Sequence, residues 1–454
     1  MRFVIAGGGV AGLAAALAVA RAGHTAVVLE RDDVGPHPSP ESAFAATRNG
    51  IPHFHQPHAF LPRGRRVLGT LAPDVLDALL EAGADPQDLR DRLRGPHEPE
   101  DEDLVYLWVR RPVIEWALRR AAAAQEGVDL RPGVRVAGLI ASENGARRAL
   151  GVALEGAEPV LGDVVVDALG RYRCPPGWPR ADAEPVDSRA IYFCRYFRLN
   201  EGAEHMDAPL LNPRGDLGYM GFNTFRGDNR TYAVILIVPA TDRALRVLRS
   251  ETAWMRACSS TRALDTLTSP EYGRPITPVM PMGGLMNVDR TGDPGVAGLV
   301  AVGDALCHTD PAFSYGLAFS LLHAEALAAA AADGSDAVGD RYRADVGPEA
   351  RERFALACET DAARALRWTG EPVDVGRRDG CYPLFAFAAA LAAAPHDDLV
   401  LRRTIRRIGM LDRTAVFDRD GDLHERVERI FGELMRTPPP PAGPPRDELL
   451  ALLA

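Results

Sequence analysis

Lysine is missing from this sequence, so all 52 of its basic side chains are arginines. A Schiff base, a P-loop lysine that holds phosphate, and halogen transfer through a lysine amine all require the missing ammonium group. The sequence excludes each of these sites. Cysteine is also sparse: the six cysteines form no C-x-x-C pair, a pattern typical of free thiols in a reducing compartment.

Long hydrophobic runs and basic clusters are lacking as well. No apolar run reaches the length of a bilayer span without a charge or a turn residue, and the first predicted strand leads into a glycine loop rather than a signal peptide. A net charge of −10 argues against a nucleic-acid partner. We therefore expect a cytoplasmic protein with no membrane or nucleic-acid partner, whose 454 residues suit two or three joined units.

A glycine-rich turn follows directly after the first predicted strand. In the segment VIAGGGVAGLAAALAVARAGHTAVVLER, Gly7, Gly9 and Gly12 have the spacing G-x-G-x-x-G. The first glycine permits the tight turn, the second lets the backbone approach a pyrophosphate, and the third lets helix and strand pack closely. Glu30 ends the next predicted strand, where a carboxylate can bind ribose hydroxyls. This context predicts a Rossmann-type dinucleotide site; Glu30 disfavours NADP and leaves NAD and FAD open.

Aromatic and β-branched residues gather in the passages IYFCRYFRL, LGYMGFNTF and TYAVILIVP, which predict an antiparallel sheet. Five of their aromatic side chains are candidates for an apolar substrate pocket: Tyr192, Tyr196, Tyr219, Phe222 and Phe225. Because side chains alternate between the faces of a strand, about half of this set is expected to pack in the core. Helical patterns are predicted at 64–83 and 111–126, and an irregular segment at 36–62.

A second turn with glycine and an acid occurs late in the chain. The passage GLVAVGDALCHTDPAFSYGLAFSLLHAEALA contains a hydrophobic strand, a Gly303-Asp304 turn, a loop with Pro311 and Gly316, and a long apolar helix. With the first glycine turn, it resembles the flavoprotein monooxygenases of the p-hydroxybenzoate hydroxylase type. DVVVDALGR and VRRPVIEWALRRAA resemble two further passages of that family, and GIPHFHQPHAFLPRG and PITPVMPMGGLMN resemble a bacterial subgroup that acts on natural products. The resemblance selects FAD as the cofactor.

The resemblance also implies roles for individual residues. Asp304 would bind the ribityl chain, and the loop from Pro311 to Gly316 would lie beside the isoalloxazine ring. The helix that follows would direct its amino terminus, with Gly316 and Leu317, at the pyrimidine edge, where negative charge appears on reduction. The predicted FAD contacts are Gly7, Gly9, Gly12, Glu30, Arg31, Arg48, Arg111, Asp304, Pro311, Gly316 and Leu317.

Histidines near the predicted ring position are the candidates for proton chemistry. We predict His58, in a loop that the family places near the flavin, and His308, just before Pro311, as catalytic residues. For His308, a loop position that faces solvent is the alternative. His53, His55 and His58 have the spacing H-x-H-x-x-H, but no second ligand cluster accompanies them. We therefore predict no metal.

The predicted fold class is α/β, with a Rossmann-like FAD-binding domain, an inserted antiparallel β-sheet substrate domain and a helical C-terminal region. The FAD-binding domain is expected in two parts, 1–180 and 281–340. The substrate domain is expected at 181–280 and the helical region at 341–454. Because no second G-x-G-x-x-G is present, we expect no dedicated NAD(P)H domain.

By resemblance, the chain is an FAD-dependent monooxygenase that hydroxylates or epoxidises a hydrophobic natural-product intermediate through a flavin C4a-(hydro)peroxide. Its expected partners are a small hydrophobic organic substrate, molecular oxygen, and NADH or NADPH as transient electron donor, either directly or through a separate flavin reductase. Two alternatives stay open: a dehydrogenase or reductase on the same scaffold, and a non-redox cyclase with structural FAD. The missing lysine argues against halogenation.

Overall fold

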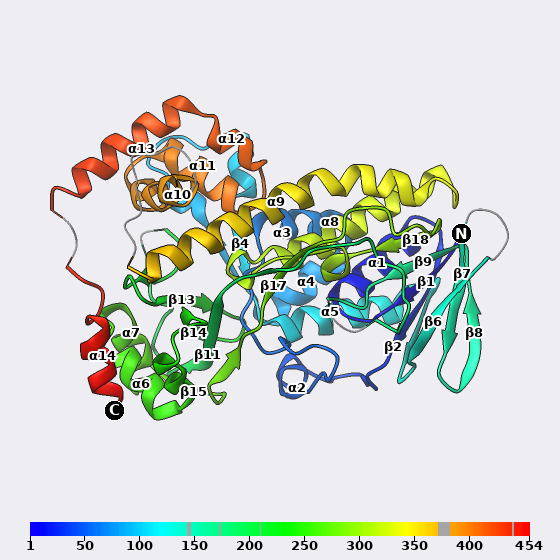
Figure 1. Cartoon of the computed structure of the whole chain (residues 1–454), viewed down its shortest axis with the longest axis horizontal. Coiled ribbons are helices and arrows are strands. Elements are labelled where there is room, and N and C mark those ends of the chain that lie inside the picture. Colours follow the sequence, from blue (N-terminus) through cyan, green and yellow to red (C-terminus); the bar gives the residue numbers. More distant parts are fainter. Residues whose placement is uncertain (143–146, 172–173, 209, 371–381, 438–439) are drawn as a thin grey trace.

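The first predicted strand lies at the centre of a five-stranded parallel sheet (Figure 1). The computed structural model describes residues 1–142, 147–171, 174–208, 210–370, 382–437 and 440–454. In their order across the sheet, the strands are β18 (Leu299–Ala301), β9 (Val164–Asp167), β1 (Arg2–Ala6), β2 (Thr25–Glu30) and β5 (Val128–Pro132). Every neighbouring pair is parallel. The sheet therefore brings strands from distant parts of the sequence to the glycine turn.

Three helices with large apolar surfaces pack near this sheet. They are α1 (Val10–Arg21), α5 (Arg111–Ala124) and α8 (Tyr315–Ala330). Alanine, leucine and valine fill almost every side of α1, which is buried along most of its length and packs against α8. Within the described residues, the stretch Tyr315–Asp333 is long and apolar enough to cross a bilayer, yet 67% of its apolar window is buried inside the protein. Such burial is typical of a core helix.

The single helix predicted over residues 64–83 is wrong. The structure has two helices there, α3 (Pro62–Leu71) and α4 (Pro73–Glu81). Pro73 has no amide hydrogen to donate to a preceding turn, and its ring would clash with the backbone of a continuing helix. It therefore ends one helix and occupies the first position of the next, where a missing donor is tolerated.

A larger antiparallel sheet lies beside the parallel one. Its strands, in order, are β12 (Arg214–Asp216), β13 (Gly221–Arg226), β14 (Thr231–Pro239), β11 (Ala190–Leu199) and β15 (Gly273–Pro275), and β16 (Met280–Met282) also pairs with β11. One face packs on α6 (Glu251–Ser259), α7 (Arg262–Thr268) and α14 (Arg446–Leu453). The other face packs toward β4 (Val105–Trp108), α8 and the C-terminal helices.

Three smaller groups of strands accompany the two large sheets. Two strands form one pair, β3 (Asp85–Asp88) and β4 (Val105–Trp108). Three form a sheet at the edge of the molecule: β6 (Val136–Ala141), β7 (Ala149–Leu154) and β8 (Ala157–Leu161). Three more are β10 (Val186–Asp187), β17 (Met286–Asp289) and β19 (Cys307–His308). The predicted irregular segment 36–62 contains one short helix, α2 (Pro40–Ala45).

The C-terminal part of the chain is helical. Its helices before α14 are α9 (Val338–Trp368), α10 (Tyr382–Ala393), α11 (Asp398–Ile408), α12 (Thr414–Asp418) and α13 (Gly421–Leu434). Figure 1 shows α10 to α13 gathered at one end of the molecule, while α9 runs from α8 toward the antiparallel sheet. α9 therefore joins the two large sheets.

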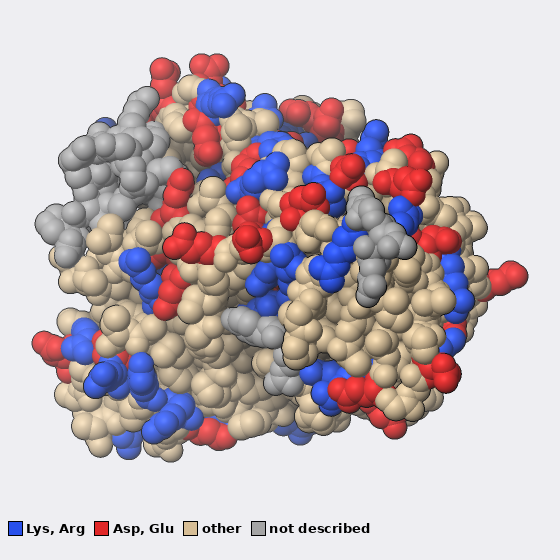
Figure 2. Space-filling view, turned by 45° about the vertical axis from the view of Figure 1, so that its right-hand side comes forward, with Lys and Arg blue, Asp and Glu red and all other residues tan. Residues whose placement is uncertain are grey.

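Acidic and basic side chains are interspersed on the face shown in Figure 2, so this face carries no broad region of one charge. Five of the six cysteines lie in the described part of the chain, where they are free thiols, and Cys381 lies outside it. The predicted α/β class, with a parallel sheet and a further antiparallel sheet, is confirmed. The domain boundaries stay predictions.

Candidate functional site

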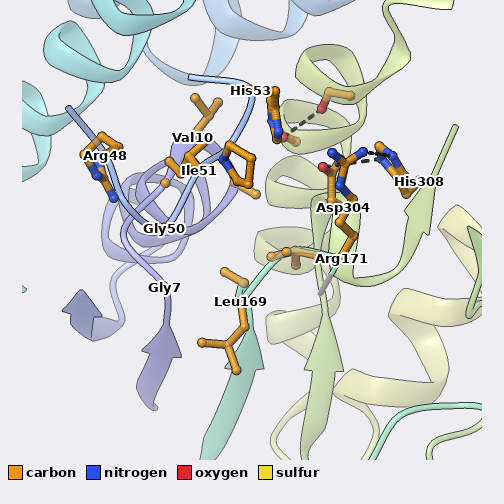
Figure 3. A pocket seen from close by; sticks show the side chains of 18 of the residues that line it. Gly7, Val10, Arg48, Gly50, Ile51, His53, Leu169, Arg171, Asp304 and His308 are labelled. Carbon is orange, nitrogen blue, oxygen red and sulfur yellow. Dashed lines mark hydrogen bonds and ion pairs between the residues drawn. The ribbon is translucent and has the colours of Figure 1, made fainter. Parts of the chain in front are cut away.

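A single cavity of about 620 Å³ runs from the glycine turn after β1 to the beginning of α8 (Figure 3). Twelve of the thirteen predicted site residues line it: Gly7, Gly9, Glu30, Arg31, Arg48, His58, Arg111, Asp304, His308, Pro311, Gly316 and Leu317. The thirteenth, Gly12, lies in α1 directly behind the turn. Residues that the sequence separates widely are therefore brought to one cavity.

The glycine turn leaves no room for side chains at two of its three positions. A Cβ atom on Gly7, whose φ is +111°, would lie 2.3 Å from the carbonyl oxygen of Ala168, and one on Gly12 would lie 1.9 Å from the carbonyl oxygen of Gly7. Gly9 is different, because only Ile51 comes within 4 Å of its missing Cβ. Gly9 caps α1 and faces the cavity. The backbone there is open to a ligand.

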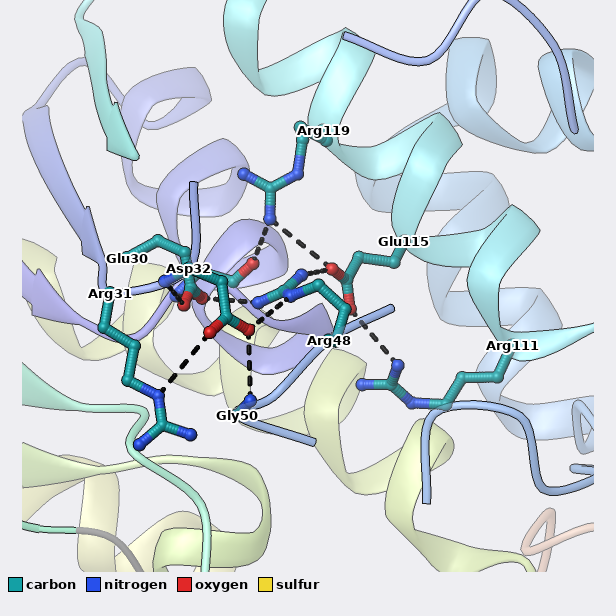
Figure 4. Close-up of polar contacts among 9 residues, drawn as sticks. Glu30, Arg31, Asp32, Arg48, Gly50, Arg111, Glu115 and Arg119 are labelled. Atoms are coloured by element: carbon teal, nitrogen blue, oxygen red, sulfur yellow. Dashed lines mark hydrogen bonds and ion pairs between the residues drawn. The ribbon is translucent and has the colours of Figure 1, made fainter. Parts of the chain in front are cut away.

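Glu30 and Arg48 form a buried ion pair at the glycine end of the cavity (Figure 4). One oxygen of Glu30 accepts hydrogen bonds from the Gly8 amide at 3.0 Å and from Arg48 Nη2 at 2.6 Å. Arg48 Nε donates to Asp32 at 2.9 Å, and the Gly50 amide donates to the same carboxylate at 3.1 Å. Burial opposes ionisation of Asp32, but these bonds hold its pKa below the usual range. Asp32 was not among the predicted site residues.

Helix α5 adds a third acid and two more arginines to this network. Glu115 forms ion pairs with Arg48, with Arg111 at 3.2 Å and with Arg119 at 3.4 Å. Arg119 also donates to the carbonyl of Gly8 at 2.6 Å. Sequence reasoning missed Glu115 and Arg119. Arg111, Glu115 and Arg119 follow one another at intervals of four residues, which places all three on one face of the helix. The wall of the cavity is therefore rich in buried guanidinium groups.

Arg111 is held in the charged form less firmly than an ordinary arginine, although Glu115 lies 3.2 Å away. Burial, followed by repulsion from Arg48, lowers its pKa to about 9, and attraction to Asp304 and Glu30 offsets only part of that effect. A buried cation in this state gains stability from an anionic ligand. A pyrophosphate between Arg111 and the glycine turn would provide that anion.

Asp304 and His308 form the polar contact at the other end of the cavity. Asp304 lies in a short 3₁₀ turn, Gly303–Ala305, and its carboxylate is 3.4 Å from His308 Nδ1. The other ring nitrogen of His308 contacts Arg171. Burial opposes ionisation of Asp304, but His308, His53 and Arg171 hold its pKa far below the usual range. His308 is only 7% exposed, so the alternative of a solvent-facing histidine is wrong.

Two further histidines, His53 and His58, lie together in the cavity wall, with ring centroids 5.8 Å apart. Burial, followed by repulsion from Arg111, lowers the pKa of both, and that of His58 falls to about 4. Both rings are therefore neutral at pH 7. His55 turns away and bonds the Phe44 carbonyl at 2.7 Å, and no group of three metal-ligating side chains occurs among the residues described.

The loop after His308 leads into α8 along the cavity. A 3₁₀ turn, Pro311–Phe313, is followed by Ser314 with a left-handed φ of +57°, and α8 begins at Tyr315. Gly316 and Leu317 lie in the first helical turn, where amide groups lack partners within the helix. The positive end of the α8 dipole therefore faces the cavity.

The predicted aromatic set divides between the two faces of the antiparallel sheet. Tyr192, Tyr196 and Phe225 belong to the face that packs toward α8 and the C-terminal helices, and none of the five aromatic candidates lines the cavity. Tyr219 and Phe222 pack on the opposite face, against α6 and α14. Sequence reasoning missed Asp310, the buried partner of Tyr192. The Asp310 carboxylate accepts a hydrogen bond from the tyrosine hydroxyl.

The geometry fits FAD on several counts. The glycine turn exposes backbone near buried Arg111, whose pKa is lowered, Glu30 lies where a ribose would be bound, and the start of α8 points into the far end of the same cavity. Residues 2–59, which include the glycine turn, Glu30, Arg48 and His58, match the FAD binding domain family. No curated protein matches the chain in sequence.

Solved structures share the fold at low identity. The probable FAD-dependent monooxygenase PqsL from Pseudomonas aeruginosa is 16% identical, with a TM-score of 0.55 over 82% of this chain and 98% of that chain. The flavin-dependent halogenase CmlS is 17% identical (TM-score 0.62, 96% and 78%), as is the Diels-Alderase PyrE3 of pyrroindomycin biosynthesis (TM-score 0.58, 90% and 80%). At these identities the likeness shows the fold alone. The chain contains an FAD-binding domain within a fold that flavin-dependent monooxygenases and halogenases share.

Proposed function

We propose that this chain is an FAD-dependent monooxygenase of the p-hydroxybenzoate hydroxylase type that hydroxylates or epoxidises a small hydrophobic natural-product intermediate. The observation that carries the proposal is the one continuous cavity between Glu30 and the amino terminus of α8. Bound FAD, once reduced, would supply the activation of molecular oxygen. NADH or NADPH would provide the electrons in the cytoplasm, directly or through a separate reductase.

In this proposal the chain's own residues bind and orient the cofactor. Glu30 would bind the adenosine ribose, with Arg31 beside it. Arg48 and Arg111 would face the pyrophosphate, and Asp304 would bind the ribityl chain. Pro311 would flank the ring, and the amides of Gly316 and Leu317 would stabilise negative charge at its pyrimidine edge. Gly7, Gly9 and Gly12 would shape the turn that receives the phosphates.

The two histidines that we proposed as catalytic have different hydrogen bonds. His58 Nδ1 lies 2.8 Å from the Gln56 carbonyl and must donate to it, so Nε2 of the neutral ring is a proton acceptor. His308 contacts the Asp304 carboxylate through Nδ1 and the Arg171 donor group through Nε2. We therefore propose His58 as the residue that takes up a proton in the cavity and His308 as a positioning residue for Asp304.

The decisive experiment follows the oxygen atom. Purified protein with FAD and NADH is supplied with ¹⁸O₂ and a panel of hydrophobic aromatic and polyene substrates. A monooxygenase incorporates one labelled atom into product for each NADH consumed. Substrate oxidation without label supports the dehydrogenase alternative. Loss of NADH with hydrogen peroxide release, and no product from any substrate, would contradict the proposal.

A non-redox cyclase is the second candidate, because PyrE3, which shares the fold, is named a Diels-Alderase. A cavity that folds a polyene substrate next to a permanently bound cofactor would suffice for such a reaction. The two candidates differ in their need for oxygen. Turnover that continues undiminished under strict anaerobiosis, with no NADH consumed, would favour the cyclase.

A further inference from the structure

A buried cluster of polar side chains lies beside the cavity, where β11, β17 and the loop before α8 meet α9, and one of its members, Asp310, lines the cavity. Its members are Tyr192 on β11, Asn287 on β17, Asp310 before the Pro311–Phe313 turn, and Asp361 and Arg364 on α9. The two carboxylic acids are each only 1% exposed. None of these residues belongs to the FAD contacts proposed above.

The hydrogen bonds of the cluster converge on the two acids. Arg364 Nη2 donates to Asp310 at 2.7 Å and to Asp361 at 2.8 Å, so one guanidinium nitrogen bridges both. Asn287 donates its amide to Asp361 at 2.8 Å and accepts the backbone amide of Asp310 at 2.6 Å. The Tyr192 hydroxyl donates to Asp310. Each acid is thus fixed from several elements at once.

Charge does not balance in this cluster if both acids are ionised. Two buried carboxylates would then face one guanidinium group, and Arg364 is the cation that acts on Asp361 among the residues described. Burial raises the pKa of the Tyr192 hydroxyl and of the Cys358 thiol, so both are neutral. A lone buried negative charge is strongly unfavourable, whereas one shared proton makes the cluster neutral.

The electrostatics indicate which acid carries the proton. Burial, followed by repulsion from Asp310, raises the pKa of Asp361 to about 8. Burial also opposes ionisation of Asp310. The charge of Arg364 and the hydrogen bonds that Asp310 forms with Asp361, Arg364 and Tyr192 nevertheless hold the Asp310 pKa below its usual range. The pair resembles other carboxyl dyads that hold one proton between them.

Asp310 connects this pair to the cavity wall. Its carboxylate accepts the backbone amide of Ala312 at 3.0 Å and so caps the Pro311–Phe313 turn. Pro311 and the first turn of α8 line the cavity. We propose that Asp361 and Asp310 share one proton, and that this protonated pair is a positioning device that ties α9 to the wall of the FAD cavity. Loss of the proton places two like charges side by side and loosens the turn.

The test measures FAD binding and flavin fluorescence between pH 6 and pH 9.5, in wild-type protein and in Asp361→Asn. For the wild type we expect the FAD dissociation constant to rise as the pH passes the raised pKa of Asp361; a pKa difference of about one unit between the free and the FAD-bound protein would make this rise about tenfold. Asparagine keeps the shape, can donate to Asp310 as the protonated acid does, and cannot ionise, although its amide nitrogen replaces one of the two oxygens that accept from Arg364 and Asn287. The FAD affinity of Asp361→Asn should therefore stay constant over this pH range. The matched control is Glu359→Gln on the exposed side of α9, which should keep the wild-type midpoint.

A second measurement needs no variant and no cofactor. Infrared spectra of the wild-type protein should show the carbonyl band of a buried protonated carboxylic acid at pH 7, and this band should vanish by pH 9.5. A wild-type protein without this band, or an Asp361→Asn protein with an unchanged FAD midpoint, would overturn the proposal. The inference does not depend on oxygen insertion, so failure of the monooxygenase assignment leaves both readouts interpretable.

Discussion

The carbonyl oxygen of Gly7 lies so close to Gly12 that a Cβ on Gly12 would be 1.9 Å from it. We therefore expect Gly12→Ala to push α1 away from the turn, to lower FAD occupancy sharply and to destabilise the protein by more than about 1–3 kcal/mol, the typical cost of overpacking. Flavin absorbance and thermal unfolding measure both effects. Gly432→Ala is the control, because its missing Cβ has open space on α13. A yellow Gly12→Ala protein of normal stability would contradict the packing argument.

Asp304→Asn tests the other end of the cavity. The carboxylate lies beside His308 and Arg171, which stabilise its negative charge, and the neutral amide loses that attraction. We expect FAD affinity to fall by about tenfold or more, since a lost charge-assisted hydrogen bond is worth about 1.5–3 kcal/mol. Equilibrium dialysis gives the dissociation constant. Asp336→Asn, at an acid whose side chain is 92% exposed, should bind FAD normally.

Because the pKa values of His53 and His58 are lowered in the folded protein, we expect the protein to lose stability in mild acid. Their pKa values are lowered in the folded state, to about 4 for His58 against a usual 6.5, so the unfolded chain binds more protons as the pH falls below 6.5. His58 should remove about 1.4 kcal/mol of stability per pH unit between pH 6.5 and pH 4, and His53 should add to this loss in the same direction. In His58→Gln this slope should decrease by one proton, as urea unfolding at several pH values would show. The same slope in His58→Gln and in the exposed-site control His97→Gln would count against the assignment.

Arg110 and Asp228 form a fully buried ion pair, with Arg110 Nε 3.0 Å from the carboxylate and both side chains 0% exposed. Asp228→Asn leaves the guanidinium without its buried partner charge, and we expect a loss of about 3–5 kcal/mol in the free energy of unfolding. Guanidinium chloride unfolding measures it. Asp345→Asn removes the partner of an exposed pair on α9 and should change stability by less than about 1 kcal/mol. Equal effects of the two changes would refute the burial argument.

The sequence could predict the parts of the site that local backbone chemistry determines. The glycine spacing at Gly7 and Gly12 follows from sterics within one strand, turn and helix, and Glu30 follows from the end of the next strand. These constraints act over short stretches of chain, so the residue pattern within each stretch is enough to predict them. The late Asp304 turn required a family resemblance, because nothing in its own few residues indicates which cavity it will meet.

The rest depends on contacts that only the folded chain creates. Asp32 and Glu115 matter because Arg48 reaches both, and the partners come from three different elements. Asp361 on α9 contacts Asp310 in the loop before α8, and no residue spacing in the sequence predicts this contact. The break before α4 was missed for another reason: the apolar periodicity continues across Pro73, and only the missing amide of proline interrupts it.

The position of β18 in the parallel sheet has a consequence for protein synthesis. The ribosome completes β1 and the glycine turn first, but β18 and Asp304 emerge much later, after roughly 15–60 s at about 5–20 residues per second. Until then the nascent chain has half of a cavity and an unpaired edge on β9. On the proposed assignment, FAD binds only after α8 has been made, so a chain that ends before α8 cannot capture the cofactor.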